Sequence, residues 1–283
     1  MQLRSILTYF LTSMLLTLGC QFADAGPTQF RDQWLCRDEN FIRYLQSPGR
    51  SQNIGNFEWF KPGDPKLLVF GDVHFVSDPL VLAKIFEAAK NAMQEKKSCL
   101  LLELSQDPVG IIRDFKYILT RPKNEEVARN VGQILNYFEP VISSATNHKM
   151  KIYGVDVDVA DNVPDDEAMA IRNRQMASNI QKLLKSGDCD SAIFMVGKGH
   201  ILSTSRTPKT SNVTQEMRHL GIAFTTFNLQ NTRDEHWGEW SGCQPDWHIP
   251  RIFKNDFISP NTELFTWPSY GKWGDFDFTI LLH

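Results

Sequence analysis

The chain has 283 residues, of which 42% are hydrophobic and 22% are charged, and its formal net charge at pH 7 is -3. This composition is typical of a globular protein long enough for one large domain with a substantial core. No run or stripe of lysine and arginine stands out, which argues against nucleic acid as a partner.

The first 25 residues have the pattern of a secretory signal peptide. Arg4 precedes an apolar run at 6–18, and Ala-Asp-Ala at 23–25 is a small-x-small cleavage site. We therefore expect an exported protein, periplasmic or secreted. Two alternatives remain open. The run could be an uncleaved anchor, although it is short for a membrane span, or Leu-Gly-Cys at 18–20 could be processed as a lipoprotein, with Cys20 as the lipid anchor and the sole contact with a membrane.

After this segment the sequence predicts an N-terminal extension at 26–64 and one α/β domain at 65–283. Within the domain, short apolar runs alternate with longer segments that have helical periodicity or helix-capping residues. The predicted strands are 66–70, 99–104, 151–155, 192–196, 222–227 and 276–282, and the predicted helices are 78–93, 108–119, 124–148 and 165–183. Alternating β and α elements with continuously apolar strands predict a three-layer α/β/α fold with a mostly parallel sheet.

Four cysteines follow the predicted cleavage site, an even number that suits disulfides in an exported chain. Cys36 and Cys243 both lie in aromatic-rich flanks outside the predicted sheet, and we expect them to pair. Cys99 and Cys189 lie at or just before predicted strands, where they could be bridged or be buried thiols. There is no CxxC motif, so zinc-ribbon and thioredoxin-like sites are excluded.

Titratable side chains lie at or just after the end of each of the first four predicted strands. The first strand leads into Gly71-Asp72-Val-His74, the second contains Glu103 near its end, the third is followed by Asp156, and the fourth leads into Gly-Lys-Gly-His200. Ligands of parallel sheets bind beyond the carboxyl ends of the strands, so these groups form the candidate site. Each also has a structural alternative: a satisfied histidine, a buried ion pair, or, for Asp156, a solvated acidic loop.

Arg172 lies on the apolar face of the helix predicted after residue 165. A guanidinium in that position is expected to pair with buried carboxylates, most directly Glu103, unless it extends to solvent. Five of the seven tryptophans lie in or just beyond the C-terminal flank at about 228–270. It is either an aromatic lid over the pocket or, the interpretation that we favour, a small separate core.

The order of these motifs resembles one superfamily. Gly-Asp-Val-His74, Leu-Leu-Leu-Glu103, Tyr-Gly-Val-Asp156, Arg172 to Asn179 and Val-Gly-Lys-Gly-His200 are similar, in sequence order, to the erythromycin-esterase-like, ChaN-like haem-binding and Tiki/TraB proteins. The resemblance covers roughly 66–205. The family motif usually begins Gly-Glu-x-His, so Asp72 replaces a glutamate here, and the second histidine of several branches is absent.

The resemblance implies a strand-end site with three uses. In the esterase-like branch, His74 would be the general base on water, Glu103 or Asp72 would orient it, and His200 would polarise the substrate, with Arg172 completing the catalytic set. In the Tiki-like branch, His74, Glu103, Asp156 and His200 would bind a divalent metal, and such ligands suit Zn, Mn, Co or Fe. In the ChaN-like branch, the same pocket would bind haem.

We therefore expect a hydrolase of the esterase or metal-dependent peptidase type, acting on a small-molecule or peptide substrate. The alternatives are a non-enzymatic haem- or metal-binding protein and an exported module that has kept the fold and lost the activity. The replacement of glutamate by Asp72 favours the last of these.

Overall fold

The computed structural model describes residues 52–53, 57–59, 66–72, 79–93, 97–105, 107–122, 124–160, 162–201, 211–231, 265–268 and 276–282. The expected signal peptide, Cys20, the proposed Cys36–Cys243 pair and the tryptophans of the C-terminal flank, except Trp267, lie outside these residues. In the part of the chain that is described, no helix is long and apolar enough to cross a membrane.

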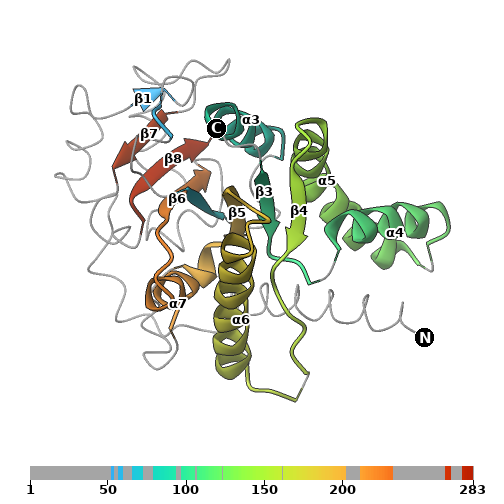
Figure 1. Ribbon diagram of the computed structural model, residues 1–283. Coiled ribbons are helices and arrows are strands. Elements are labelled where there is room, and N and C mark those ends of the chain that lie inside the picture. Colours follow the sequence, from blue (N-terminus) through green and yellow to red (C-terminus); the bar gives the residue numbers. More distant parts are fainter. Residues whose placement is uncertain are drawn as a thin grey trace, which may run out of the picture.

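The described strands form one mixed sheet in the order β1-β7-β8-β6-β2-β5-β3-β4 (Figure 1). The strands are β1 (Gln52–Asn53), β2 (Leu67–Asp72), β3 (Ser98–Leu102), β4 (Lys151–Gly154), β5 (Ser191–Gly197), β6 (Thr225–Asn231), β7 (Phe265–Pro268) and β8 (Phe278–Leu282). From β8 to β4 all neighbours are parallel. Only β7 runs antiparallel to its neighbours β8 and β1 among the described strands, which confirms the mostly parallel sheet.

Helices cover both faces of this sheet (Figure 1). One apolar core lies under α3 (Pro79–Ala92), α4 (Pro108–Thr120) and α5 (Glu125–Asn147). A second core lies under α6 (Asp165–Lys185) and α7 (Val213–His219). The α/β/α layers expected from the sequence are therefore confirmed.

The central strands are continuously apolar because both of their faces are buried. In β2, Leu68 and Phe70 belong to the first core, whereas Leu67 and Val69 belong to the second. All six residues of β2 are buried. The alternation of side chains along a strand thus divides one hydrophobic run between two helical layers.

Residues of the expected N-terminal extension also reach the first core. Trp59 is 4% exposed, and its ring centroid lies 5.9 Å from that of Phe70 and 5.2 Å from that of Phe227. Phe57 packs edge-on against Trp59 at 5.0 Å. The part of the extension that precedes β2 therefore contributes aromatic surface to the main domain.

Several elements differ from the sequence-based expectation. The strand predicted at 222–227 lies at Thr225–Asn231, and α7, β1 and β7 were not predicted. The cap of α6 is Pro164, with Asp165 as the first helical residue and no side-chain cap bond. In the sheet, β5 lies between β2 and β3, so the first two predicted strands are parallel without being neighbours.

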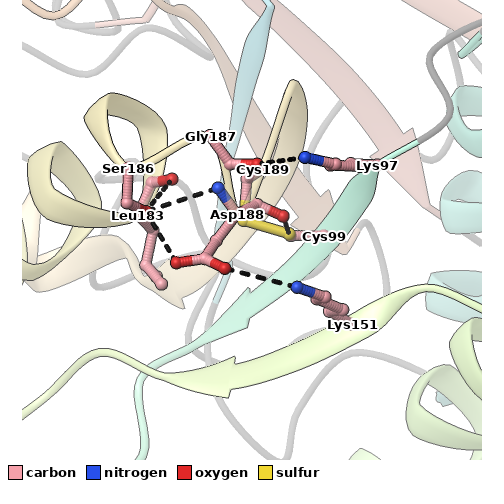
Figure 2. Close-up of a disulfide and its surroundings, with 8 residues drawn as sticks. All are labelled: Lys97, Cys99, Lys151, Leu183, Ser186, Gly187, Asp188 and Cys189. Atoms are coloured by element: carbon pink, nitrogen blue, oxygen red, sulfur yellow. Dashed lines mark hydrogen bonds and ion pairs between the residues drawn. A yellow bond between two sulfur atoms is a disulfide. The ribbon is translucent and has the colours of Figure 1, made fainter.

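Cys99 and Cys189 form a disulfide between the start of β3 and the residues just before β5 (Figure 2). Both are buried, at 0% and 2% exposure. The ε-ammonium of Lys97 donates to the Gly187 carbonyl at 2.9 Å, and that of Lys151 donates to Asp188 at 3.3 Å. Of the two alternatives left open by the sequence, the bridged one is therefore found, at the amino ends of the strands.

Candidate functional site

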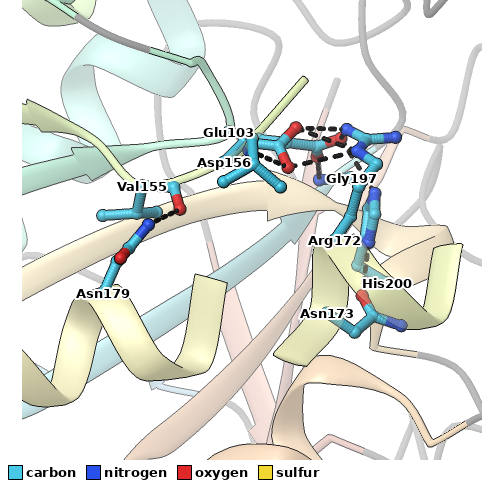
Figure 3. A network of polar contacts seen from close by, with 9 residues as sticks. Glu103, Val155, Asp156, Arg172, Asn173, Asn179, Gly197 and His200 are labelled. Carbon is cyan, nitrogen blue, oxygen red and sulfur yellow. Dashed lines mark hydrogen bonds and ion pairs between the residues drawn. The ribbon is translucent and has the colours of Figure 1, made fainter. Parts of the chain in front are cut away.

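Three of the expected site residues converge at the carboxyl ends of neighbouring strands (Figure 3). Glu103 directly follows β3, and Asp156 comes two residues after β4. His200 ends η2 (Lys198–His200), a single 3₁₀ turn that follows β5. The convergence depends on the position of β5 beside β3, because that pairing places the turn next to Glu103.

The first turns of α6 deliver a fourth side chain, Arg172, to this edge. The helix packs Met176, Ala177 and Ile180 against the sheet, and Arg172 precedes Met176 by one helical turn. Its guanidinium reaches the carboxylates of Glu103 and Asp156 (Figure 3). Of the two orientations considered from the sequence, the structure shows the one directed at buried acids.

Glu103 is held on both carboxylate oxygens. Its Oε1 accepts a hydrogen bond from Arg172 Nη2 at 2.6 Å, and its Oε2 accepts the backbone N–H of Gly197 at 2.7 Å. The side chain is only 4% exposed. A buried carboxylate is costly unless it is paired and hydrogen-bonded, and Glu103 meets both conditions.

Asp156 holds the other side of the guanidinium. Arg172 Nε donates to its two carboxylate oxygens at 3.1 and 3.0 Å, and Nη2 donates to Oδ2 as well. The Asp156 side chain is 8% exposed, and its Oδ1 also accepts the N–H of Val157 at 2.8 Å. Asp156 is therefore part of a buried ion-pair network and not simply the start of a solvated acidic loop.

The pKa of Arg172 is raised above its ordinary value. Burial lowers the pKa, but the negative charges of Asp156 and Glu103, together with the hydrogen bonds that they accept, outweigh this effect. The guanidinium consequently stays charged at every pH at which the protein would be studied.

One nitrogen of the guanidinium remains available. Arg172 uses Nε and Nη2 for all its hydrogen bonds to the described residues, and none involves Nη1. The Arg172 side chain is 14% exposed, more than Glu103, Asp156 or His200. The site thus presents a fixed cationic N–H donor at the end of the sheet.

His200 is almost fully buried, at 1% exposure, and both ring nitrogens face oxygen atoms. Its Nδ1 lies 2.6 Å from Oδ1 of Asn173 on α6. Its Nε2 lies 2.9 Å from Oε1 of Glu103, in a contact that is not aligned as a hydrogen bond. Such burial prevents His200 from contacting a substrate directly, so the polarising role implied by the family resemblance does not fit this geometry.

The structure places only one of the two remaining expected residues. His74 lies outside the described residues. Asp72 ends β2 and is 1% exposed. Because side chains alternate along a strand, Asp72 shares the α3 face of the sheet with Phe70, whereas Glu103 and Arg172 lie on the α6 face.

The described part of the site does not fit a divalent metal. Arg172 already occupies Glu103 and Asp156 with hydrogen bonds, and His200 directs both nitrogens at other side chains. The guanidinium supplies the positive charge that a metal would otherwise supply. Over the described residues, no group of three or more His, Cys, Asp or Glu side chains is arranged to hold a metal ion.

Two glycines near the strand ends differ in how closely they are packed. Gly71 lies inside β2 and does not turn the chain. A Cβ atom there would come within 2.7 Å of Ile201 Cδ1 and 2.8 Å of Phe276 Cε1. A Cβ on Gly199 would meet nothing within 4 Å. Gly71 therefore permits close packing of Ile201 and Phe276 beside the site. At Gly199, by contrast, no described residue comes close enough to require a glycine.

Sequence reasoning missed two groups that hold the site. Asn173 contacts His200, and the N–H of Gly197 contacts Glu103. Asn173 lies on the same helical face as Met176 and Ile180, so a polar residue on an otherwise apolar stripe was the signal that could have identified it. The role of the Gly197 N–H cannot be predicted from the sequence, because a backbone group is not marked by a residue type.

No protein-family model matches this chain, and no curated protein sequence matches it. Three solved structures are similar to it in part. The type III effector HopBA1 has 12% identity over 58% of this chain and 77% of its own, with a TM-score of 0.41. RRSP, a MARTX toxin effector domain from Vibrio vulnificus CMCP6, has 14% identity over 59% of this chain and 33% of its own, with a TM-score of 0.38.

The third similar structure is the C-terminal region of Pasteurella multocida toxin, which is described as having a thiol-protease-like catalytic triad. It has 10% identity over 79% of this chain and 29% of its own, with a TM-score of 0.36. These likenesses are too distant to place the chain in a family. Its function therefore has to be inferred from the site.

Proposed function

We propose that the protein is an exported hydrolase that uses water to cleave an ester or amide bond at the carboxyl edge of its sheet. The observation that carries the proposal is the state of Arg172. Two buried carboxylates fix its guanidinium, and Nη1 remains as a donor that forms no hydrogen bond to the described residues. A fixed cationic donor is the group that stabilises negative charge developing on a carbonyl oxygen.

The topology of the sheet supports this location. The connection after β2 leads to α3 on one face, and the connection after β5 leads to α7 on the other. Because β2 and β5 are neighbours, the face on which the next helix lies reverses between two adjacent strands. In open α/β sheets ligands bind where this reversal occurs.

In the proposed reaction His74, which comes two residues after the end of β2 in the sequence, removes a proton from water. The water oxygen then bonds to the carbonyl carbon, and the carbonyl oxygen takes up the negative charge and accepts a hydrogen bond from Arg172 Nη1. Collapse of this intermediate breaks the bond to the alkoxide or amine, which takes the proton back from His74. Glu103 and Asp156 keep Arg172 in place during both steps.

This reaction needs no metal, in agreement with the poor fit of the described residues to one. It corresponds to the esterase-like use of the motifs that the family resemblance implies. Haem binding of the ChaN-like type has less support, because neither ring nitrogen of the buried His200 is available to an iron. The substrate would be a small molecule or a peptide.

Export is proposed on two grounds. Residues 1–25 have the pattern of a signal peptide, and the Cys99–Cys189 disulfide suits an oxidising compartment. A lipid anchor at Cys20 would retain the same domain at a membrane surface.

The proposal is tested with the full chain, exported from a host that forms disulfides and assayed on ester and peptide panels. Wild type, His74→Ala and Arg172→Lys are compared, with Arg174→Lys as the matched control, because Arg174 is an exposed residue of the same helix. We expect hydrolysis by wild type and Arg174→Lys, none by His74→Ala, and a kcat lower by about 10²–10³ in Arg172→Lys.

Two further measurements separate the alternatives. A metal that co-purifies stoichiometrically and is required for turnover would overturn the metal-free reaction. A Soret band on haem titration that is lost in His74→Ala would favour the haem-binding alternative. Absence of hydrolysis across the panels, with the protein folded, would favour the inactive module.

A further inference from the structure

We infer that Asn173 is a positioning residue that sets the protonation pattern of His200 and, through it, holds Glu103 against Arg172. The inference rests on the proposed function for its catalytic consequence. Asn173 follows Arg172 directly on α6 and is 2% exposed. One turn of α6 thus supplies both Arg172, the donor at the sheet edge, and Asn173, which we infer to position it through His200 and Glu103.

The orientation of the Asn173 amide is fixed by two partners. Its Nδ2 donates to the Ser211 carbonyl at 3.0 Å, and a carbonyl can only accept. The amide oxygen must therefore face His200, whose Nδ1 lies 2.6 Å away. Because that oxygen is also an acceptor, Nδ1 of His200 carries a proton.

The segment that contains Ser211 also fixes the 3₁₀ turn that carries His200. Asn212, the neighbour of Ser211 and the cap of α7, donates from Nδ2 to the Ile201 carbonyl at 2.7 Å. The Asn212 amide oxygen accepts the N–H of Gln215 at 2.8 Å, so its orientation is set as well. One short segment before α7 thus fixes the backbone beside His200 directly and the imidazole ring through Asn173.

With the ring fixed, Nε2 faces Glu103 Oε1 at 2.9 Å. If His200 were neutral with its proton on Nδ1, the lone pair of Nε2 and the carboxylate oxygen 2.9 Å away would both be acceptors, and their contact would be repulsive. A second proton between Nε2 and Oε1 removes the repulsion. It also balances the charges, because Glu103 and Asp156 carry two negative charges against one positive charge on Arg172.

Removing the Asn173 acceptor should change this pattern. In Asn173→Leu no oxygen faces Nδ1, so a neutral ring with its only proton on Nε2 can lie beside the Glu103 carboxylate without a second proton. In Asn173→Asp an acceptor remains beside Nδ1, although the donor to Ser211 is lost. Nδ1 should therefore lose its proton in Asn173→Leu and retain it in Asn173→Asp.

The experiment is nitrogen-15 NMR of the histidine rings in the full chain, with His200 assigned by its loss in His200→Gln. Asn179→Ala is the matched control. It removes another α6 amide, one that donates to the Val155 carbonyl at 2.9 Å, without touching His200. We expect a protonated Nδ1 in wild type, Asn173→Asp and Asn179→Ala, and an unprotonated one in Asn173→Leu. An unprotonated Nδ1 in wild type, or an unchanged ring in Asn173→Leu, would overturn the inference.

Kinetics provide the second readout. If the proposed hydrolase is correct, Asn173→Leu should lower kcat by about 10–100-fold, as loss of a residue that orients a site group does, with little change in KM and partial recovery in Asn173→Asp. Failure of the proposed function and failure of this inference give different results. If the ring signals are as expected but wild type hydrolyses nothing, only the hydrolase proposal is overturned. If Asn173→Leu hydrolyses substrate as fast as wild type, the positioning role of Asn173 is overturned.

Discussion

Glu103 and Arg172, which are 69 positions apart in the sequence, share a hydrogen bond of 2.6 Å between Oε1 and Nη2. This contact joins the end of β3 to α6, and Asp156 joins the same guanidinium to the end of β4. Two strand ends and a helix are therefore tied together by one cation. The stability of the site and its chemistry depend on the same residue.

Arg172→Met should lower the free energy of unfolding by about 3–5 kcal/mol, because it leaves two buried carboxylates without their cation. Urea unfolding at neutral pH measures the loss. The triple variant Arg172→Met/Glu103→Gln/Asp156→Asn should recover most of it, since the buried charges are then removed together. A triple variant no more stable than Arg172→Met would show that uncompensated charge is not the cause.

Gly71→Ala should be destabilising by about 1–3 kcal/mol, because its Cβ would overlap Ile201 and Phe276 in a filled core. Gly132→Ala is the control. Gly132 lies inside α5, where a Cβ would meet nothing within 4 Å, so alanine should stabilise the helix by about 0.5–1 kcal/mol. Denaturation midpoints of the two variants should move in opposite directions, and equal shifts would contradict the close packing at Gly71.

The Cys99–Cys189 bridge should contribute about 2–5 kcal/mol, since it closes a long loop in the unfolded chain. Peptide mapping of the unreduced protein should find these two cysteines linked. The double variant Cys99→Ala/Cys189→Ala should reproduce the loss of stability caused by a reductant. Any further loss when this variant is reduced would come from another bridge, such as the expected one between Cys36 and Cys243.

Glu87 on α3 should make a small pH-dependent contribution to stability. The hydrogen bond from Ser144 lowers the pKa of this carboxyl, and His148 lowers it further, against an opposing effect of burial. A carboxyl with a lowered pKa stabilises the fold above its unfolded pKa, and this contribution is lost as the pH falls through the folded pKa.

The effect of Glu87 is measured by comparing wild type with Glu87→Gln in urea. Because the Glu87 side chain is 46% exposed, the difference at pH 7 should stay below about 1 kcal/mol. It should shrink as the pH falls below the unfolded pKa of about 4.3 and be lost once the pH is below the lowered folded pKa as well. Ser144→Ala should remove most of the same difference, and a gap between wild type and Glu87→Gln that widens toward acid would contradict the assignment.

Much of the fold could be predicted because the central strands are buried on both faces. A run such as 66–70 is then continuously apolar, and the helices between such runs show one apolar face. Arg172 could be predicted as the partner of Glu103 for the same reason, since a charge on an apolar helical face needs a buried counter-charge.

Other features depend on contacts that no local pattern encodes. The position of β5 between β2 and β3 depends on pairing between strands that are far apart in the sequence. The shift of β6 to Thr225–Asn231 follows from its pairing with β2 and β8. The seven residues of α7 are too few for a clear helical period. With four cysteines in the expected mature chain, three connectivities were open, so the Cys99–Cys189 bridge required the three-dimensional structure.

The most direct test of the central claim is the kcat of Arg172→Lys relative to wild type on whichever ester or amide the wild type cleaves. Lysine keeps the charge but lacks the planar fork that binds both carboxylates while leaving one nitrogen available. We predict a kcat lower by about 10²–10³, with Arg174→Lys unchanged. Full activity in a folded Arg172→Lys variant would contradict the claim that Arg172 is the donor at the reacting carbonyl.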